Sequence, residues 1–89
     1  MNQKVNIIDV RSPMEYMSGH VQGSVNIPLP ELHAHMDEIK QMEGDIVVCC
    51  ASGMRSAQAQ RLLQHEQINA SNGGSWMDVQ FAIHKEETI

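Results

Sequence analysis

The chain has 89 residues, 42% of them hydrophobic and 19% charged, a composition typical of one globular domain over residues 1–89. Its formal net charge of -5 argues against a nucleic-acid partner, which needs a basic face, and offers no long-range attraction for an anionic substrate. The two cysteines are adjacent, so they cannot form a disulfide that links distant parts of the chain. No stretch approaches the roughly 20 apolar residues of a membrane span.

The first third of the chain predicts two buried strands with a short helix between them. Short apolar runs at 6–10 and 25–27 are typical of buried strands. Between them, Ser12 suits a helix N-cap, Pro13 suits the first helical position, and Glu15 completes a capping box as its only expected role.

The middle of the chain predicts a helix, the central strand and a second helix. Residues 30–42 carry apolar side chains at the helical i, i+4, i+7 spacing. Residues 46–49 are apolar throughout, as expected of a strand that is covered on both faces. Residues 55–67 predict the next helix. The residues expected to share the buried face of the first helix are Leu32, Met36 and Ile39.

The last third predicts a short strand at 68–71, a turn at 72–74 and a final helix that opens at 75–78 with a second capping-box pattern. The polar tail at 85–89 is expected to fray. Strands and helices therefore alternate along the whole chain. This order predicts a small α/β domain: an open, mainly parallel sheet with helices on both faces and sites at the carboxyl ends of its strands.

The most informative segment is the junction where Cys50 stands between a strand and a helix. Backbone N–H groups and the positive end of a helix dipole at such a junction lower the pKa of a thiol and stabilise an anion on its sulfur. Cys50 is therefore expected to be a nucleophile, against the alternative of an ordinary buried cysteine. Cys49 alternates to the other face of the strand and is expected in the core. The loop expected to bind substrate consists of Ala51, Ser52, Gly53, Met54 and Arg55.

Three blocks of sequence, in the right order, resemble the rhodanese family in its single-domain sulfurtransferase form. Residues 8–28 resemble the N-terminal signature of that family, residues 50–56 its active-site loop, and residues 72–76 its C-terminal Gly-Gly block with a tryptophan. Most members of the family have a further strand and helix before the first block, whereas only six residues precede Ile7 here. The chain is in this respect similar to the shortened, phage-shock protein E type of rhodanese.

The resemblance implies a two-step sulfur transfer through a persulfide on Cys50. The donor would be a small sulfur anion such as thiosulfate, the acceptor cyanide or a thiol, and no cofactor or metal is expected. Arg55 is either a second anion ligand or a structural residue that holds the loop rim through a carboxylate. Asp9 and Arg11 follow a strand end and are expected to support the loop, and Ser56 is expected to cap the helix behind it.

Two other functions fit parts of the pattern. A carrier module would hand its persulfide sulfur to a partner protein with little turnover of small molecules. A cysteine phosphatase of the same fold would need a Cys-x5-Arg loop, whereas Cys50 and Arg55 enclose only four residues, and the shorter ring favours sulfur over a tetrahedral phosphate.

Adjacent cysteines suit a reducing compartment, so we expect a cytoplasmic protein with no membrane partner. The first residues, Met1 to Lys4, do not resemble a secretion signal. A chain from which a signal peptide had been removed would look the same, which leaves the periplasm as the alternative compartment.

Overall fold

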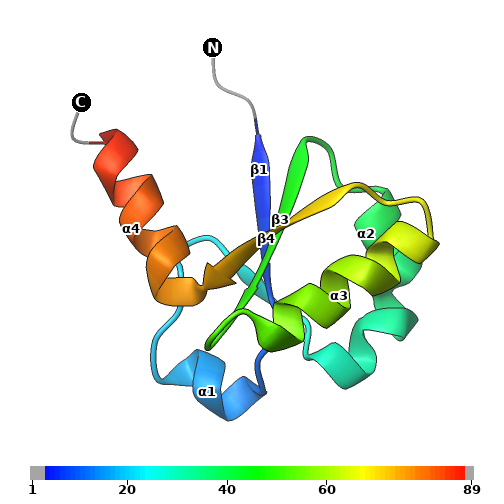
Figure 1. The fold of residues 1–89 in the computed structure, drawn as a ribbon, viewed down its shortest axis with the longest axis horizontal. Helices are drawn as coiled ribbons and strands as arrows, with labels where there is room; N and C mark the ends of the chain where they lie inside the picture. The colour runs from blue at the N-terminus through cyan, green and yellow to red at the C-terminus, as the bar shows by residue number, and fades with distance from the viewer. Residues whose placement is uncertain (1–3, 88–89) are drawn as a thin grey trace.

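The computed structural model describes residues 4 to 87 and contains one four-stranded sheet in the order β2-β1-β3-β4 (Figure 1). All three strand pairings are parallel, which confirms the expected α/β class. The central position of the Cys50 strand is also confirmed, because β3 lies between β1 and β4. The strands are β1 (Val5–Asp9), β2 (Val25–Asn26), β3 (Asp45–Cys50) and β4 (Ala70–Ser75).

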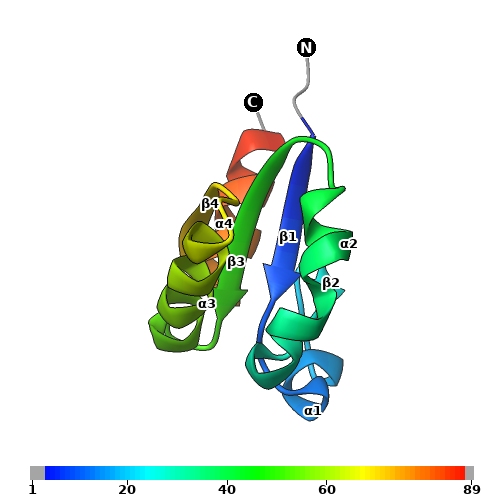
Figure 2. The same ribbon diagram turned by 90° about the vertical axis from the view of Figure 1, so that its right-hand side faces the viewer.

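Helices cover both faces of the sheet (Figure 2). One buried cluster joins one face of the strands to the short helices η1 and α2 and to α3, and a second cluster joins the opposite face to α4. The short helix α1 lies beyond the carboxyl ends of the strands, beside the start of α3. The helices are α1 (Pro13–Met17), η1 (Leu29–His35), α2 (Met36–Lys40), α3 (Met54–His65) and α4 (Trp76–Glu87).

The side chains of β3 alternate strictly between the two buried clusters. Val48 and Cys50 belong to the cluster under α3, whereas Val47 and Cys49 belong to the cluster under α4. This is the period-two geometry of a strand, and it confirms that the adjacent cysteines point to opposite faces.

Two of the predicted helix starts, those of α1 and α4, are confirmed by hydrogen bonds. At α1, the Glu15 N–H donates to Ser12 Oγ at 3.3 Å, and the Ser12 N–H donates to Glu15 Oε1 at 3.0 Å, which completes a capping box. At α4, the Asp78 N–H donates to Ser75 Oγ at 3.1 Å. These side chains satisfy backbone donors that a helix terminus leaves unpaired.

The helix predicted at 30–42 is wrong in form. The segment is a 3-10 helix, η1, followed by the single α-helical segment α2, and the winding changes at His35, whose φ of -107° and ψ of 14° lie outside the α region. The predicted buried face survives the change, because it is the tertiary contact with the sheet that holds these side chains. The buried residues are Leu32, Met36 and Ile39.

The turn predicted at 72–74 is also wrong, because these residues belong to β4. Val48 pairs with Asn72 but Cys49 pairs with Gly74, so Gly73 is an extra residue that forms a bulge. The glycine-rich composition therefore marks a bulge and a close packing contact, not the end of a strand. The predicted fraying tail lies within α4 as far as Glu87, and its last two residues are outside the described part of the chain.

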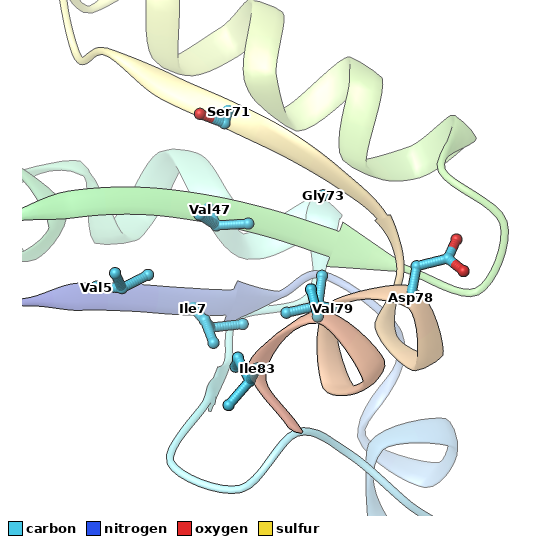
Figure 3. Close-up of a pocket in the computed structure, with 9 residues that line it drawn as sticks. Val5, Ile7, Val47, Ser71, Gly73, Asp78, Val79 and Ile83 are labelled. Atoms are coloured by element: carbon cyan, nitrogen blue, oxygen red, sulfur yellow. The ribbon is translucent and has the colours of Figure 1, made fainter. Parts of the chain in front are cut away.

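Gly73 lies on the face of the sheet that packs against α4, near Val47 and Val79 (Figure 3). A Cβ atom at this position would stand 2.6 Å from Val79 Cγ2 and 2.8 Å from Val47 Cγ1, so Gly73→Ala must push the helix away from the sheet. We expect this variant to lose about 1 to 3 kcal/mol of unfolding free energy, the usual cost of overpacking. Urea denaturation measures the loss. Ser71→Ala, at an exposed position of the same strand, is the matched control, and equal stability of the two variants would contradict the prediction.

Candidate functional site

Cys50 is the last residue of β3, and its sulfur lies directly under the loop that leads into α3. The Gly53 N–H donates to Cys50 Sγ at 2.9 Å, and Ser56 Oγ lies 3.4 Å from the same sulfur. Gly53 is the N-cap of α3 and has a φ of 102°, a conformation that glycine adopts without strain. The loop therefore turns its backbone N–H groups toward the sulfur.

The two adjacent cysteines are both fully buried, yet their thiols have opposite acidities. Burial raises the pKa of Cys50, but the Ser56 hydroxyl and the backbone N–H groups of Ser56, Gly53 and Ser52 outweigh it and lower that pKa from its ordinary 9.0 to about 7. Burial, with the nearby Asp9 charge, raises the pKa of Cys49 to about 12. At neutral pH only Cys50 has an appreciable thiolate fraction, which is the reactive form.

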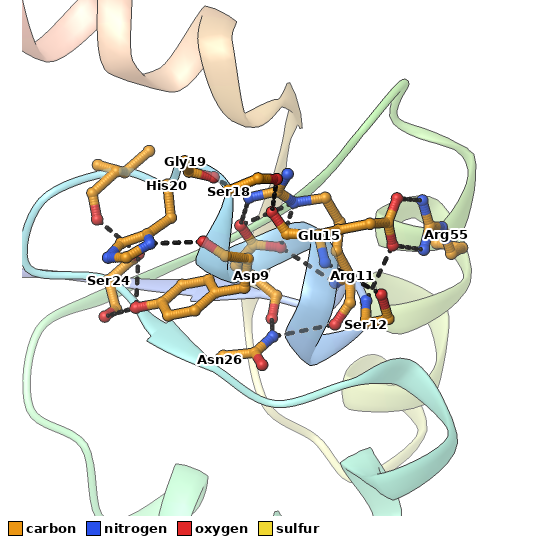
Figure 4. Close-up of polar contacts among 12 residues, drawn as sticks. Asp9, Arg11, Ser12, Glu15, Ser18, Gly19, His20, Ser24, Asn26 and Arg55 are labelled. Carbon is orange, nitrogen blue, oxygen red and sulfur yellow. Dashed lines mark hydrogen bonds and ion pairs between the residues drawn. The ribbon is translucent and has the colours of Figure 1, made fainter.

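Arg55, on the first turn of α3, is paired with a carboxylate of α1 (Figure 4). Its Nη1 and Nη2 donate to Glu15 Oε1 and Oε2 at 2.8 and 3.0 Å, a two-point contact that fixes the guanidinium plane. Glu15 also accepts the Ser12 N–H, so this carboxylate joins the start of α1 to the start of α3. The sequence predicted the capping role of Glu15 but not its partner across the site.

The Glu15–Arg55 pair predicts a pH dependence of stability. The Arg55 hydrogen bond, with the Ser12 N–H, lowers the pKa of Glu15 from 4.5 to about 2. A depressed carboxyl pKa contributes stability that is complete above pH 4.5 and is lost as the pH falls toward about 2. Glu15→Gln should therefore destabilise the protein at neutral pH, and its difference from the wild type should shrink through this window.

Denaturant midpoints measured across the acid range test this expectation, with Glu31→Gln at an exposed position of η1 as the control. A difference between wild type and Glu15→Gln that stays constant down to about pH 2 would contradict it.

Asp9 and Arg11 form a buried ion pair where β1 ends. Arg11 Nη2 lies 2.7 Å from Asp9 Oδ2 and donates to the Gly19 carbonyl at 2.7 Å, and its guanidinium carbon lies 5.0 Å from the Trp76 ring centre. These contacts join the end of β1 to the α1–β2 segment and to the start of α4. Among the described contacts of Arg11 none reaches the Cys50 loop, so its support for that loop is at most indirect.

The expected helix cap at Ser56 is wrong. Gly53 is the N-cap, and Ser56 lies inside the first turn of α3 with its side chain fully buried. Its hydroxyl lies between Cys50 and Asn72, donating to Asn72 Oδ1 at 2.7 Å. The bulge of β4 brings Asn72 to this position, and no local signal in the sequence marks it as part of the site.

A hollow on the α4 face of the sheet lies apart from the cysteine site. A cavity of about 380 Å³ lies between the sheet and α4, with Ile7, Val47 and Ile83 on its walls (Figure 3). Cys50 points to the opposite face. Within residues 4 to 87, no group of three or more His, Cys, Asp or Glu residues could hold a metal ion, and no helix is long and apolar enough to cross a membrane.

The fold and this geometry define a class of protein. It is a parallel α/β domain in which the central strand ends on a cysteine of lowered pKa, and the backbone N–H groups of the next loop donate to the sulfur of that cysteine. A family model described as the rhodanese-like domain matches residues 1–79. The chain therefore belongs to the rhodanese-like family, as the three sequence blocks predicted.

The relatives that are similar to the chain include one named as a sulfurtransferase and one named as a candidate sulfur carrier. It is 36% identical to the thiosulfate sulfurtransferase PspE of Escherichia coli K12 over 74 residues, which cover 81% of this chain and 71% of PspE. It is 35% identical over 65 residues to YrkF of Bacillus subtilis 168, which is named as a candidate sulfur carrier protein; the match covers 73% of this chain but only 35% of YrkF. Among solved structures, a rhodanese with anions from E. coli superposes with a TM-score of 0.76 at 32% identity, covering 84% of this chain and 91% of that one.

Proposed function

We propose that the protein is a sulfurtransferase that moves sulfane sulfur from a small anionic donor to a thiophilic acceptor through a persulfide on Cys50. The observation that carries the proposal is the environment of Cys50 Sγ. A hydroxyl and several backbone N–H groups lower the pKa of this thiol to about 7, although its burial acts in the opposite direction. A site that stabilises a negative charge on sulfur supports thiolate attack and also suits an anionic persulfide.

With thiosulfate as donor, the Cys50 thiolate attacks the outer sulfur, a sulfur–sulfur bond forms to the protein, and sulfite leaves with the electron pair of the broken bond. The persulfide then gives its outer sulfur to cyanide, forming thiocyanate and regenerating the thiolate. A thiol acceptor would receive the sulfur in the same way. No metal or redox cofactor is needed, because each step exchanges one bond to sulfur for another.

The loop residues serve this reaction chiefly through their backbone. We assign donor binding to the loop of Ala51, Ser52, Gly53, Met54 and Arg55. The N–H groups of Ser52 and Gly53 donate to the Cys50 sulfur, and the loop leads into the N-terminus of α3, which favours an anion. The Arg55 side chain is engaged by Glu15, which favours a structural role for it at the rim of the loop. The complete burial of Cys50 under this loop favours a donor with a small terminal atom.

The persulfide is the direct test of this proposal. Incubation with thiosulfate should leave the protein heavier by one sulfur atom, and cyanide or a reductant should remove the added mass. Peptide mapping should place the sulfur on Cys50, because the high pKa of Cys49, about 12, keeps that thiol protonated. Turnover of thiosulfate without any adduct would contradict the proposed intermediate and indicate direct transfer between bound substrates.

The similarity to YrkF favours one alternative within the same chemistry, a carrier that delivers persulfide sulfur to a partner protein. The two roles differ in the second step. Rapid discharge of the adduct by cyanide supports the small-molecule enzyme, whereas discharge only by a protein thiol supports the carrier. A phosphatase role is disfavoured by the four-residue spacing between Cys50 and Arg55, and we expect no Cys50-dependent hydrolysis of an aryl phosphate.

A further inference from the structure

The Ser56 hydroxyl lies between two acceptors but has only one hydrogen to donate. Ser56 Oγ is 2.7 Å from Asn72 Oδ1 and 3.4 Å from Cys50 Sγ. Ser56 is fully buried, so water does not supply an additional partner. The hydrogen can point to the amide oxygen or to the sulfur, but not to both.

The orientation of the Asn72 amide is determined by two backbone groups. The Gly74 N–H donates to Oδ1 at 2.9 Å, and Nδ2 donates to the Gly53 carbonyl at 3.1 Å. Exchanging the amide oxygen and nitrogen would place two donors together at Gly74 and two acceptors together at Gly53. The amide therefore presents its oxygen, an acceptor, to the Ser56 hydroxyl.

We propose that Asn72 is a positioning residue of the cysteine site. While Cys50 is protonated, the amide oxygen of Asn72 accepts the hydrogen bond of the Ser56 hydroxyl. When Cys50 ionises, the hydroxyl turns and donates this hydrogen bond to the sulfur instead. In the protonated state the chain of donors runs from the Cys50 thiol to Ser56 and on to Asn72. In the thiolate state the hydroxyl rotates to the sulfur, and Asn72 Oδ1 keeps only the Gly74 N–H. Asn72 thus competes with the thiolate for the one hydrogen bond that Ser56 can donate. This competition keeps the pKa of Cys50 higher than it would be without Asn72.

Charged groups on the neighbouring elements lie around the site, and among them Arg55 interacts electrostatically with Cys50. Arg55 of α3, Asp9 and Arg11 at the end of β1, and Glu15 of α1 lie around the site, and Asp78 of α4 lies near Gly74. Asn72→Ala, Ser56→Ala and their combination leave all of these charges in place and add none. Differences in titration among these three variants therefore report on the hydroxyl.

The experiment is a titration of Cys50 in a Cys49→Ala background, followed by the ultraviolet absorbance of the thiolate. The proposal predicts that Asn72→Ala lowers the apparent pKa by about half a unit to one unit, a roughly three- to tenfold higher thiolate-to-thiol ratio, because the hydroxyl is then free to serve the sulfur. A merely structural role for Asn72 predicts the opposite sign, since a loosened loop would withdraw its N–H groups. Asn72 is exposed, so water can replace its bonds to the glycines.

Two further variants make the test specific to the hydroxyl. Ser56→Ala should raise the pKa of Cys50, and adding Asn72→Ala to it should have no further effect, because Asn72 acts through Ser56. Asn72→Asp keeps an oxygen acceptor in place and adds a negative charge, so it should raise the pKa. A raised pKa in Asn72→Ala, or an undiminished effect of that change in the absence of the Ser56 hydroxyl, would overturn the proposal.

This titration needs no sulfur donor, so its outcome does not depend on the proposed sulfurtransferase activity. If the protein also has that activity, the rate of persulfide formation can be measured as a function of pH. The acid limb of this pH profile in Asn72→Ala should move to lower pH by the same amount as the apparent pKa of Cys50. A shifted titration without sulfur transfer would leave the role of Asn72 intact and refute only the proposed function.

Discussion

Replacing Cys50 with serine is expected to abolish sulfur transfer, by at least about three orders of magnitude. A serine oxygen has a far higher pKa than a thiol and cannot form a persulfide, so neither transfer step can proceed. The loss should occur without unfolding, because Cys50 lies against the Ser56 hydroxyl and the Gly53 N–H, and both can bond to a serine oxygen. The measurement is steady-state turnover of thiosulfate with cyanide or with a thiol as acceptor.

Cys49→Ala is the matched control for this variant, since it removes an equally buried thiol one residue away. It should keep most of the activity, because Cys49 points into the apolar cluster under α4 and its raised pKa leaves it protonated. Activity that survives in a folded Cys50→Ser protein would refute the assignment of the nucleophile. Loss of activity in a folded Cys49→Ala protein would show that both thiols take part.

The largest expected effect on stability comes from Arg11→Leu. Asp9 is completely buried and Arg11 nearly so, and removal of the guanidinium leaves the Asp9 carboxylate without its charge partner. Breaking a buried ion pair in this way costs about 3 to 5 kcal/mol. The variant also loses the bond to the Gly19 carbonyl and the contact with the Trp76 ring. Thermal or denaturant unfolding at neutral pH measures the loss.

A double-mutant cycle separates the ion pair from the packing. Arg11→Leu combined with Asp9→Asn should be more stable than the sum of the single changes predicts, by roughly 0.5 to 3 kcal/mol, because the charge left unpaired by the first change is absent. Lys40→Ala is the comparison at an exposed pair, Lys40–Glu66, and should cost no more than about 1 kcal/mol. Additive single effects in the cycle would mean that the pair is not coupled.

Local patterns predicted those parts of the fold that depend on local physics. The helix cap at Ser12 follows from donors that any helix start leaves unpaired, and the alternation along β3 follows from strand geometry. The turn predicted for the Asn-Gly-Gly segment is wrong for the same reason. Its composition is typical of a turn, but Gly73 forms a bulge in β4 where Val47 and Val79 leave no room for a side chain.

The sequence by itself determined the parallel α/β architecture and the position of Cys50 at the end of the central strand. The tertiary structure alone decided which groups surround that cysteine. Glu15 and Arg55 are 40 residues apart and Ser56 and Asn72 are 16 apart, and only the packing of α1, α3 and β4 at one end of the sheet brings them together. Both cysteines have the same ordinary pKa and the same burial. The tertiary structure separates their acidities, because within residues 4 to 87 hydrogen-bond donors contact the sulfur of Cys50 and none contacts that of Cys49.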